Sequence, residues 1–275
     1  MAVYDGREGA TSAVSTYTRL VTVGPETRNS ITVPDGCHSI KEIWGWHHSI
    51  GVNARGYIMA FKLSGLKYGN YEGGLGGYTG GTLVGNAGEA KAMKSLIIKT
   101  NIAVDPGAEI WIEAAEATGA STCTPEAGIG LAFDTSQGEK RYGFFRWVAP
   151  TVNTKTLAIN DATTVTARGI KIPSDARRIT SIIPQLGGIS IATVSGATAN
   201  IRLEGGLPDG DFGFTAGADT VLATTAAVCA GYFKSEQTLT DVKVSPGATL
   251  NVYAETIGTV WTNAYVGVAL EMAVS

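Results

Sequence analysis

Residue types that bind transition metals gather in one part of the chain, at Cys37, His38, His47 and His48. Imidazole and thiolate groups are suitable ligands for zinc and for other soft metal ions. On a β-strand, however, the adjacent His47 and His48 point to opposite faces, and the ligand spacing of zinc sites is absent. We therefore predict no metal site, and we interpret His47 as a surface or interface residue.

Carboxylates occur in two further patterns that suggest chemistry. Glu113, Glu116 and Glu255 lie on predicted strands, and two carboxylates that face one cleft can hydrolyse a glycosidic bond. Their alternation indicates solvent-facing positions, so we do not expect them to converge. Residues 209–211, Asp-Gly-Asp, resemble the start of a calcium loop, but the remaining ligands and the closing glutamate are missing. A tight Asp-Gly turn is the better interpretation.

A nucleophile with a matched base cannot be assigned either. The Gly-x-Ser-x-Gly turn of serine hydrolases does not occur, and no histidine is placed with a serine or cysteine in a defensible pattern. The three cysteines, Cys37, Cys123 and Cys229, include no Cys-x-x-Cys pair and indicate reduced thiols. We predict a protein that is not an enzyme, with no catalytic residues and no cofactor.

Aromatic residues within glycine-rich sequence are the remaining candidates. Residues 65–88 contain ten glycines and three tyrosines, without the Gly-Lys-Ser/Thr of a phosphate-binding loop. A shorter counterpart, residues 205–217, carries two phenylalanines. Such segments suit contact with another subunit or stacking on a glycan, and a mobile surface loop is the alternative. Together with residues near the histidines, they give the predicted interface: Trp44, Trp46, His47, Tyr71, Tyr78, Phe212 and Phe214.

The elements that position these residues follow from an internal repeat at an offset of about 140 residues. Residues 104–112 (VDPGAEIWI) reappear as residues 244–252 (VSPGATLNV), and other blocks recur in the same order. We interpret the chain as two copies of one domain.

Each copy has the pattern of short strands. In the 104–112 block a Pro-Gly turn precedes apolar residues at every second position, as in a half-buried strand. This favours an all-β fold of two tandem β-sandwiches, with a jelly roll preferred to an immunoglobulin-like order. We place the domains at residues 17–140 and 141–275. Residues 1–16 are predicted to be an extended N-terminal arm that either frays or reaches a neighbouring subunit. Further strands are predicted at residues 96–102, 128–133, 199–203, 238–244 and 265–272.

Composition and charge exclude several classes of partner. The formal net charge of -3 argues against nucleic acid, because phosphate binding needs clustered cations. No apolar run approaches the roughly 20 residues that cross a bilayer, so we predict no membrane partner. The first residues lack the basic start and apolar run of a signal peptide, so we expect synthesis in a cytoplasm.

With its 104–112 repeat and tandem architecture, the chain resembles the tandem β-sandwich (jelly-roll) structural proteins of virions. Examples are phage capsid decoration (cement) proteins and double-jelly-roll coat proteins. The resemblance covers about residues 17–275 and includes no family-specific signature. It implies a capsid decoration or minor capsid protein, located in the virion after synthesis in the host cytoplasm. The implied partners are copies of the same chain, with a trimer favoured, and other capsid subunits.

Two alternatives stay open. The chain is a jelly-roll major coat protein in the first. In the second it is a carbohydrate- or receptor-binding module, whose exposed aromatic side chains stack on sugars. A polysaccharide-degrading enzyme ranks below both.

Overall fold

The structure is a computed structural model of the chain. It describes residues 3–10, 17–21, 28–50, 59–75, 96–116, 124–148, 154–158, 169–190, 198–217, 237–257 and 262–275. These residues form antiparallel sheets and contain no helix, which confirms the all-β prediction. Among them there is accordingly no helix that could cross a membrane.

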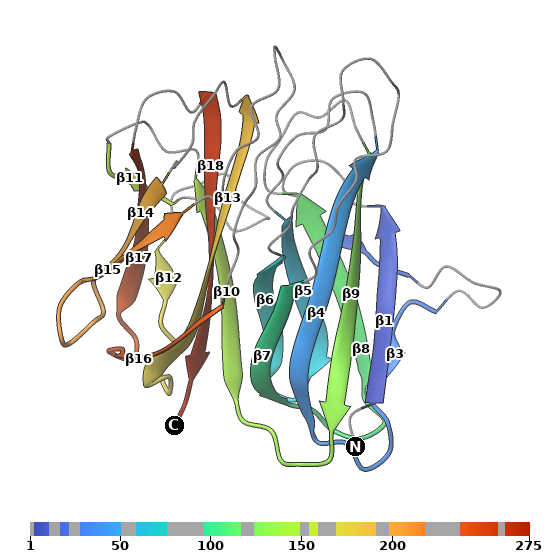
Figure 1. Ribbon diagram of the computed structural model, residues 1–275. Coiled ribbons are helices and arrows are strands. Elements are labelled where there is room, and N and C mark those ends of the chain that lie inside the picture. The colour runs from blue at the N-terminus through green and yellow to red at the C-terminus, as the bar shows by residue number, and fades with distance from the viewer. Residues whose placement is uncertain are drawn as a thin grey trace.

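The first half of the chain is a sandwich of two sheets (Figure 1). One sheet has the order β1-β9-β4-β7 and the other β2-β8-β5-β6, with β3 pairing β8. The strands are β1 (Val3–Ala10), β2 (Thr18–Arg19), β3 (Ile31–Thr32), β4 (Ser39–Ile50), β5 (Met59–Leu66), β6 (Gly69–Leu75), β7 (Leu96–Ala103), β8 (Glu109–Glu116) and β9 (Thr124–Asp134).

The second half has the same strand order. Its sheets are β10-β18-β13-β16 and β11-β17-β14-β15, with β12 pairing β17, so each strand occupies the place of the strand nine positions earlier. In both halves the chain passes repeatedly between the two sheets, apart from the hairpins β5-β6 and β14-β15, as in a jelly roll. The strands are β10 (Arg141–Val148), β11 (Thr156–Leu157), β12 (Ile170–Lys171), β13 (Arg178–Ser190), β14 (Thr198–Glu204), β15 (Phe212–Gly217), β16 (Thr238–Lys243), β17 (Thr249–Ile257) and β18 (Thr262–Ala273).

Irregular features repeat with the strands. A bulge interrupts β4 between Ile40 and Glu42, and another interrupts β13 between Ile179 and Ser181. The predicted Pro-Gly turns place Gly107 and Gly247 at φ of 76° and 75°, where a residue without a Cβ is favoured. The repeated sequence blocks therefore occupy the same places in two sandwiches of one topology.

The two cores differ in how they are closed. The core of the second half lies between its own sheets, whereas the core of the first half also includes Phe145, Ile183 and Ala269 from the second half. These three residues lie on the outer face of the β10-β18-β13-β16 sheet, the face turned away from its own core. Their strands β10, β13 and β18 cover the open side of the first sandwich, by which we mean its edge strands β6 and β7 (Figure 1).

Two sequence predictions need correction. Residues 1–16 were predicted to be an extended arm, but Val3–Ala10 form β1, which pairs with β9 over its whole length. This segment is thus an edge strand of the first sheet, because the unpaired side of β9 supplies backbone partners for it. Residues 69–75, predicted as part of a glycine-rich loop, form β6. Residues 11–16 and 76–88 lie outside the described residues.

Candidate interaction surface

Tyr71 is buried at the boundary between the two halves of the chain. It lies on β6 with 3% of its surface exposed, and its ring stacks on Phe61 with the centroids 6.3 Å apart. Its hydroxyl donates a hydrogen bond of 3.1 Å to Oε2 of Glu271 on β18. The predicted interface residue therefore joins two parts of one chain, and its side chain is not accessible to a second subunit.

Glu271 accepts hydrogen bonds from both halves. Its Oε2 accepts from Tyr71 and from the Thr100 hydroxyl, which come from the first half. Its Oε1 accepts from Arg141 Nη1 at 3.2 Å and from Thr180 Oγ1 at 2.9 Å, which come from the second half. A carboxylate that is only 4% exposed is costly unless it is paired and hydrogen-bonded. This set of donors therefore fixes how the halves meet.

The buried network holds Tyr71 in its neutral form. Burial raises the pKa of the Tyr71 phenol well above its ordinary value, and the charge of Glu271 and the hydrogen bond to it raise the pKa further. Arg141 lowers the pKa by a smaller amount. The phenol therefore keeps its proton and remains a donor to Glu271 at neutral pH.

A second contact crosses the boundary at the edge of the first sandwich. The Gln237 side chain accepts a hydrogen bond from Lys99 N at 2.7 Å and donates one to Lys99 O at 2.7 Å. Its Nε2 also donates to Ser181 Oγ at 2.9 Å. Lys99 lies on the edge strand β7, so the amide of Gln237 pairs with backbone groups much as another strand would.

The link between β9 and β10 adds a third contact. Lys140 Nζ lies 2.7 Å from Asp175 Oδ2, and the Tyr142 hydroxyl donates to Asp175 Oδ1 at 2.7 Å. The hydrogen bond from Lys140, followed by that from Tyr142, lowers the pKa of Asp175. The ammonium also lies 5.6 Å from the ring centroid of Tyr68 in the first half, so it contacts both halves.

Trp44 lies on a different surface, the outer face of the β1-β9-β4-β7 sheet. It is half-buried and pairs with Gly130 of β9 and Ile97 of β7. Its indole lies against Gly130, where an added Cβ would overlap the ring. The missing side chain of Gly130 thus lets the tryptophan ring lie flat on the sheet.

Three other predicted interface residues are described only in part or not at all. Trp46 and His47 lie on β4 opposite Gly128 and Ala127 of β9, and their side chains lie outside the described part of the structure. Tyr78 lies outside it entirely.

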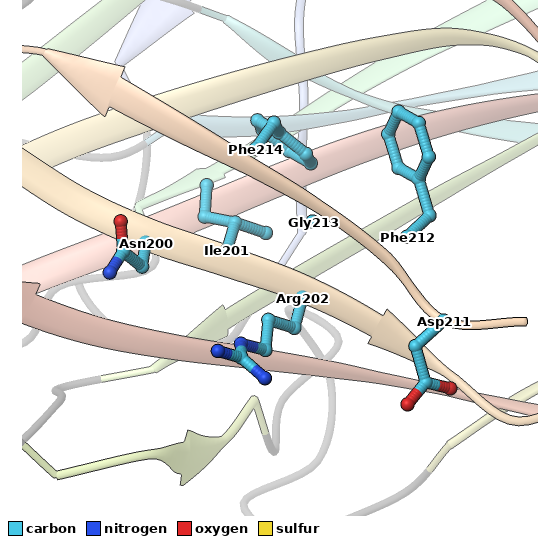
Figure 2. Close-up of a pocket in the computed structure, with 7 residues that line it drawn as sticks. All are labelled: Asn200, Ile201, Arg202, Asp211, Phe212, Gly213 and Phe214. Carbon is cyan, nitrogen blue, oxygen red and sulfur yellow. The ribbon is translucent and has the colours of Figure 1, made fainter.

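Phe212 and Phe214 lie on the edge strand β15, with their ring centroids 6.1 Å apart. Both are half-buried and pack against the core of the second half. Figure 2 shows them on one side of the β14-β15 pair, with Arg202 and Asp211 on the other. They belong to the open side of the second sandwich, its edge strands β15 and β16.

A shallow hollow of about 290 Å³ lies along the same strand pair. It forms where Gly213 presents no side chain, and Asn200, Arg202 and Asp211 contribute its polar groups (Figure 2). The phenylalanine rings point away from Arg202 and Asp211. The polar groups and the aromatic rings therefore do not face one ligand together, as sugar stacking on these phenylalanines would require.

The other sequence candidates do not gather into a site in the described residues. Glu113 and Glu255 lie on β8 and β17, in different halves, and Glu113 is 3.9 Å from Lys62. Residues 207–210 form the predicted tight turn, with Gly210 at a φ of 98°. Cys37 is buried, and within the described ranges no three potential ligands cluster as a metal site would require.

Sequence reasoning missed the residues that hold the halves together, above all Glu271, Arg141 and Gln237. Glu271 alternates with the apolar residues Leu270 and Met272, as a solvent-facing residue on a half-buried strand also does. Its burial depends on a second sandwich packing on that face, so the local pattern carried no signal of it.

Comparison with known proteins identifies no family. No family matches the sequence, and no curated protein matches it. Solved structures with a similar arrangement include N-glycanase F (PNGase F), at 9% identity with a TM-score of 0.42, covering 98% of this chain and 95% of that one. The tandem CBM22 domains of Paenibacillus barcinonensis Xyn10C are 12% identical with a TM-score of 0.25, and the match covers 98% of this chain and 93% of that one. The major capsid protein P2 of bacteriophage PM2 is 9% identical with a TM-score of 0.28, and the match covers 98% of this chain and 97% of that one. These weak similarities involve β-sandwich and capsid proteins alike, and no function follows from them.

Proposed function

We propose that the chain is a structural protein of a virion, a capsid decoration (cement) or minor capsid component that assembles with copies of itself. Its role is to form contacts, and it performs no reaction. The observation that carries this proposal is the contact between its own halves, in which the open side of one sandwich is closed by the sheet of a like sandwich. A protein that binds a copy of its own fold in this way is suited to building larger arrays.

The chemistry of the boundary supports a rigid block in preference to two hinged domains. Phe145 and Ile183 bury apolar surface there, and Glu271 is held by donors from both halves. Opening the boundary would break the hydrogen bonds from Tyr71 and Thr100 to Glu271 and would expose the apolar surface of Phe145 and Ile183 to water. Glu271, the one buried carboxylate among the described residues, therefore takes part in this contact.

Light scattering over a range of protein concentrations, with electron microscopy of the same samples, tests the proposal. We expect one defined oligomer, with a trimer favoured. Immunogold labelling of particles from the native source should then place the protein on virions. A monomer at every concentration, or label confined to non-particulate fractions, would contradict the proposal. Closed shells formed by the chain alone would favour a jelly-roll major coat protein.

Glycan binding is the second candidate. The hollow beside Gly213 has polar groups that could hydrogen-bond to a sugar, although Phe212 and Phe214 do not stack on a ligand bound there. Arg202 and Asp211 offer a donor and an acceptor in a recess open to solvent. A glycan array with the wild-type protein and Arg202→Ala tests it, and loss of a specific signal in the variant would support binding at this place. Arg178→Ala is a suitable control, because its guanidinium lies on another sheet and pairs with Asp241.

A further inference from the structure

Two surfaces meet at the boundary, the open side of the first half and an outer sheet face of the second. Each half also has the surface that the other half uses there, and the internal contact does not use these equivalent surfaces. The strands that pack across the boundary are β6 and β7 from the first half and β10, β13 and β18 from the second. Because the strand order repeats, the first half has an equivalent outer face on β1-β9-β4-β7, and the second has an equivalent open side at β15 and β16. The internal contact thus predicts which residues would meet if a second copy continued the series.

The strand pairing matches residues on the two outer faces. Trp44 pairs with Gly130 in the first half, as Ile183 pairs with Ala269 in the second. Ile183 and Ala269 are buried because the first half covers them. Trp44 is half-buried, with one side of its ring on Gly130. The counterpart of the covered residue is therefore a large aromatic ring that is still partly open to solvent.

The polar contact at the boundary is replaced by apolar residues on both of the equivalent, unused surfaces. Tyr71 pairs with Leu63 as Phe212 pairs with Leu203, so Phe212 is the counterpart of Tyr71. Directly after the bulges, Glu42 pairs with Ala132 as Ser181 pairs with Glu271, so Ala132 is the counterpart of Glu271. The hydroxyl and the carboxylate are thus both replaced by apolar groups. Because neither surface carries a polar group at these positions, a contact between Phe212 of one copy and the Ala132 region of another would bury no polar group without a partner.

The contact between Lys99 and Gln237 has the same kind of counterpart. Lys99 pairs with Glu42 as Leu239 pairs with Ser181, so Leu239 is the counterpart of Lys99. Two positions earlier in each segment, Ile97 is the counterpart of Gln237. Ile97 is 50% exposed and Leu239 is 70% exposed, and with Tyr68 they are the exposed large hydrophobic residues of the described ranges. Single exposed apolar residues are common on protein surfaces. Here the two stand at the two ends of one expected contact, where each would remove the other from water.

We propose that the β1-β9-β4-β7 face of one copy binds the β15-β16 open side of a second copy, as the corresponding surfaces bind within the chain. Ile97 of one copy then contacts Leu239 of the next, and the Trp44 face of one copy covers Phe212 of the next. Two different surfaces meet, so the contact runs head to tail and produces a ring or an open array. This inference rests on the proposed self-assembly and names the surfaces that carry it.

Cysteine cross-linking between two variants tests the register. Full-length Ile97→Cys and Leu239→Cys proteins are mixed under mild oxidation and compared with each variant alone and with the wild type. We expect at least tenfold more disulfide-linked dimer in the mixture than in either single variant. A mixture of Tyr68→Cys with Leu239→Cys is the control, because Tyr68 lies outside the proposed contact and is similarly exposed.

Charge substitution gives an independent measurement. Ile97→Lys and Leu239→Lys alter side chains that are exposed in the single chain, so each variant should keep the far-UV circular dichroism spectrum of the folded wild type while its oligomer dissociates. An intact oligomer in both variants, with no cross-linking in the mixture, would overturn this contact and leave the proposed assembly standing. A wild-type protein that is monomeric throughout would contradict the proposed function as well.

Discussion

The Tyr71 hydroxyl and the Glu271 carboxylate, 200 residues apart in the sequence, share a hydrogen bond of 3.1 Å across the boundary between the two sandwiches. Both groups are buried, and each belongs to an element that would otherwise present it to solvent: an edge strand and the outer face of a sheet. The contact therefore exists only when the halves are docked, so substitutions at these two residues report directly on docking.

Tyr71→Phe should lower the free energy of unfolding by about 1.5–3 kcal/mol, the range for a hydrogen bond to a charged group. The ring and its stacking on Phe61 remain, and only the donor to Glu271 is lost. Urea unfolding followed by fluorescence measures the change. Tyr68→Phe, at an exposed tyrosine, should change stability by less than about 0.5 kcal/mol. Equal effects of the two substitutions would contradict the role assigned to the Tyr71 hydroxyl.

The same substitution should alter the response to alkaline pH. The folded protein raises the pKa of Tyr71, so above about pH 10 the unfolded chain loses a proton that the native state keeps. Stability then falls with rising pH, by up to about 1.4 kcal/mol per pH unit for this one group. Below that pH both states are protonated and the contribution is constant. Between about pH 9 and about pH 11, the free energy of unfolding should fall less steeply with pH for Tyr71→Phe than for the wild type. Parallel pH profiles would show that the phenol ionises equally in both states.

Glu271→Gln should destabilise the protein far more than Glu139→Gln, although both carboxylates bind Arg141. Removing the charge of Glu271 leaves the guanidinium at a buried position with a weaker partner, which costs about 3–5 kcal/mol. Glu139 is exposed on 43% of its side chain, so its pair is worth about 1 kcal/mol or less. Thermal unfolding of the two variants gives the comparison, and similar losses would argue against a buried network centred on Glu271.

The local parts of this fold were predictable from the sequence, and its long-range contacts were not. The Pro-Gly turns before Ala108 and Ala248 have a signal within a few residues, and the predicted strands lie where their apolar alternation indicates. The strand Val3–Ala10 was missed because it is polar and contains two glycines, and its partner β9 lies more than a hundred residues away.

The candidate site shows the same limit. Tyr71 was selected as an interface residue from its type and its glycine-rich surroundings, but the sequence held no sign that Glu271 would face it. Ile97 and Leu239 were not selected, because each occupies an ordinary position in an alternating strand. Their significance appears only when the strand pairing aligns them with Gln237 and Lys99.

Gly107→Ala and Gly247→Ala should cost similar amounts, about 1–2 kcal/mol each, the penalty of an L-residue in the left-handed region. Both glycines have φ near 75°, and a Cβ at either would meet no other atom, so the cost is one of backbone conformation alone. Chemical denaturation of the single and double variants measures it, with additive effects expected because the turns lie in different halves. Costs that differ by more than about 1 kcal/mol would mean that the two turns are not equivalent.

Gly130→Ala should disturb the outer face of the first sheet at Trp44. The added methyl group overlaps the indole, so the ring must move outward, at a cost of about 1–3 kcal/mol, the range for overpacking. Tryptophan fluorescence should shift to longer wavelength as the ring becomes more exposed, and denaturation gives the loss of stability. Gly213→Ala is the matched control on the strand β15, because a Cβ there has only ordinary contacts and its effect should lie within about 0.5 kcal/mol. An unchanged spectrum in a destabilised Gly130→Ala protein would show that the strain is taken up by the β9 backbone while the Trp44 ring stays in place.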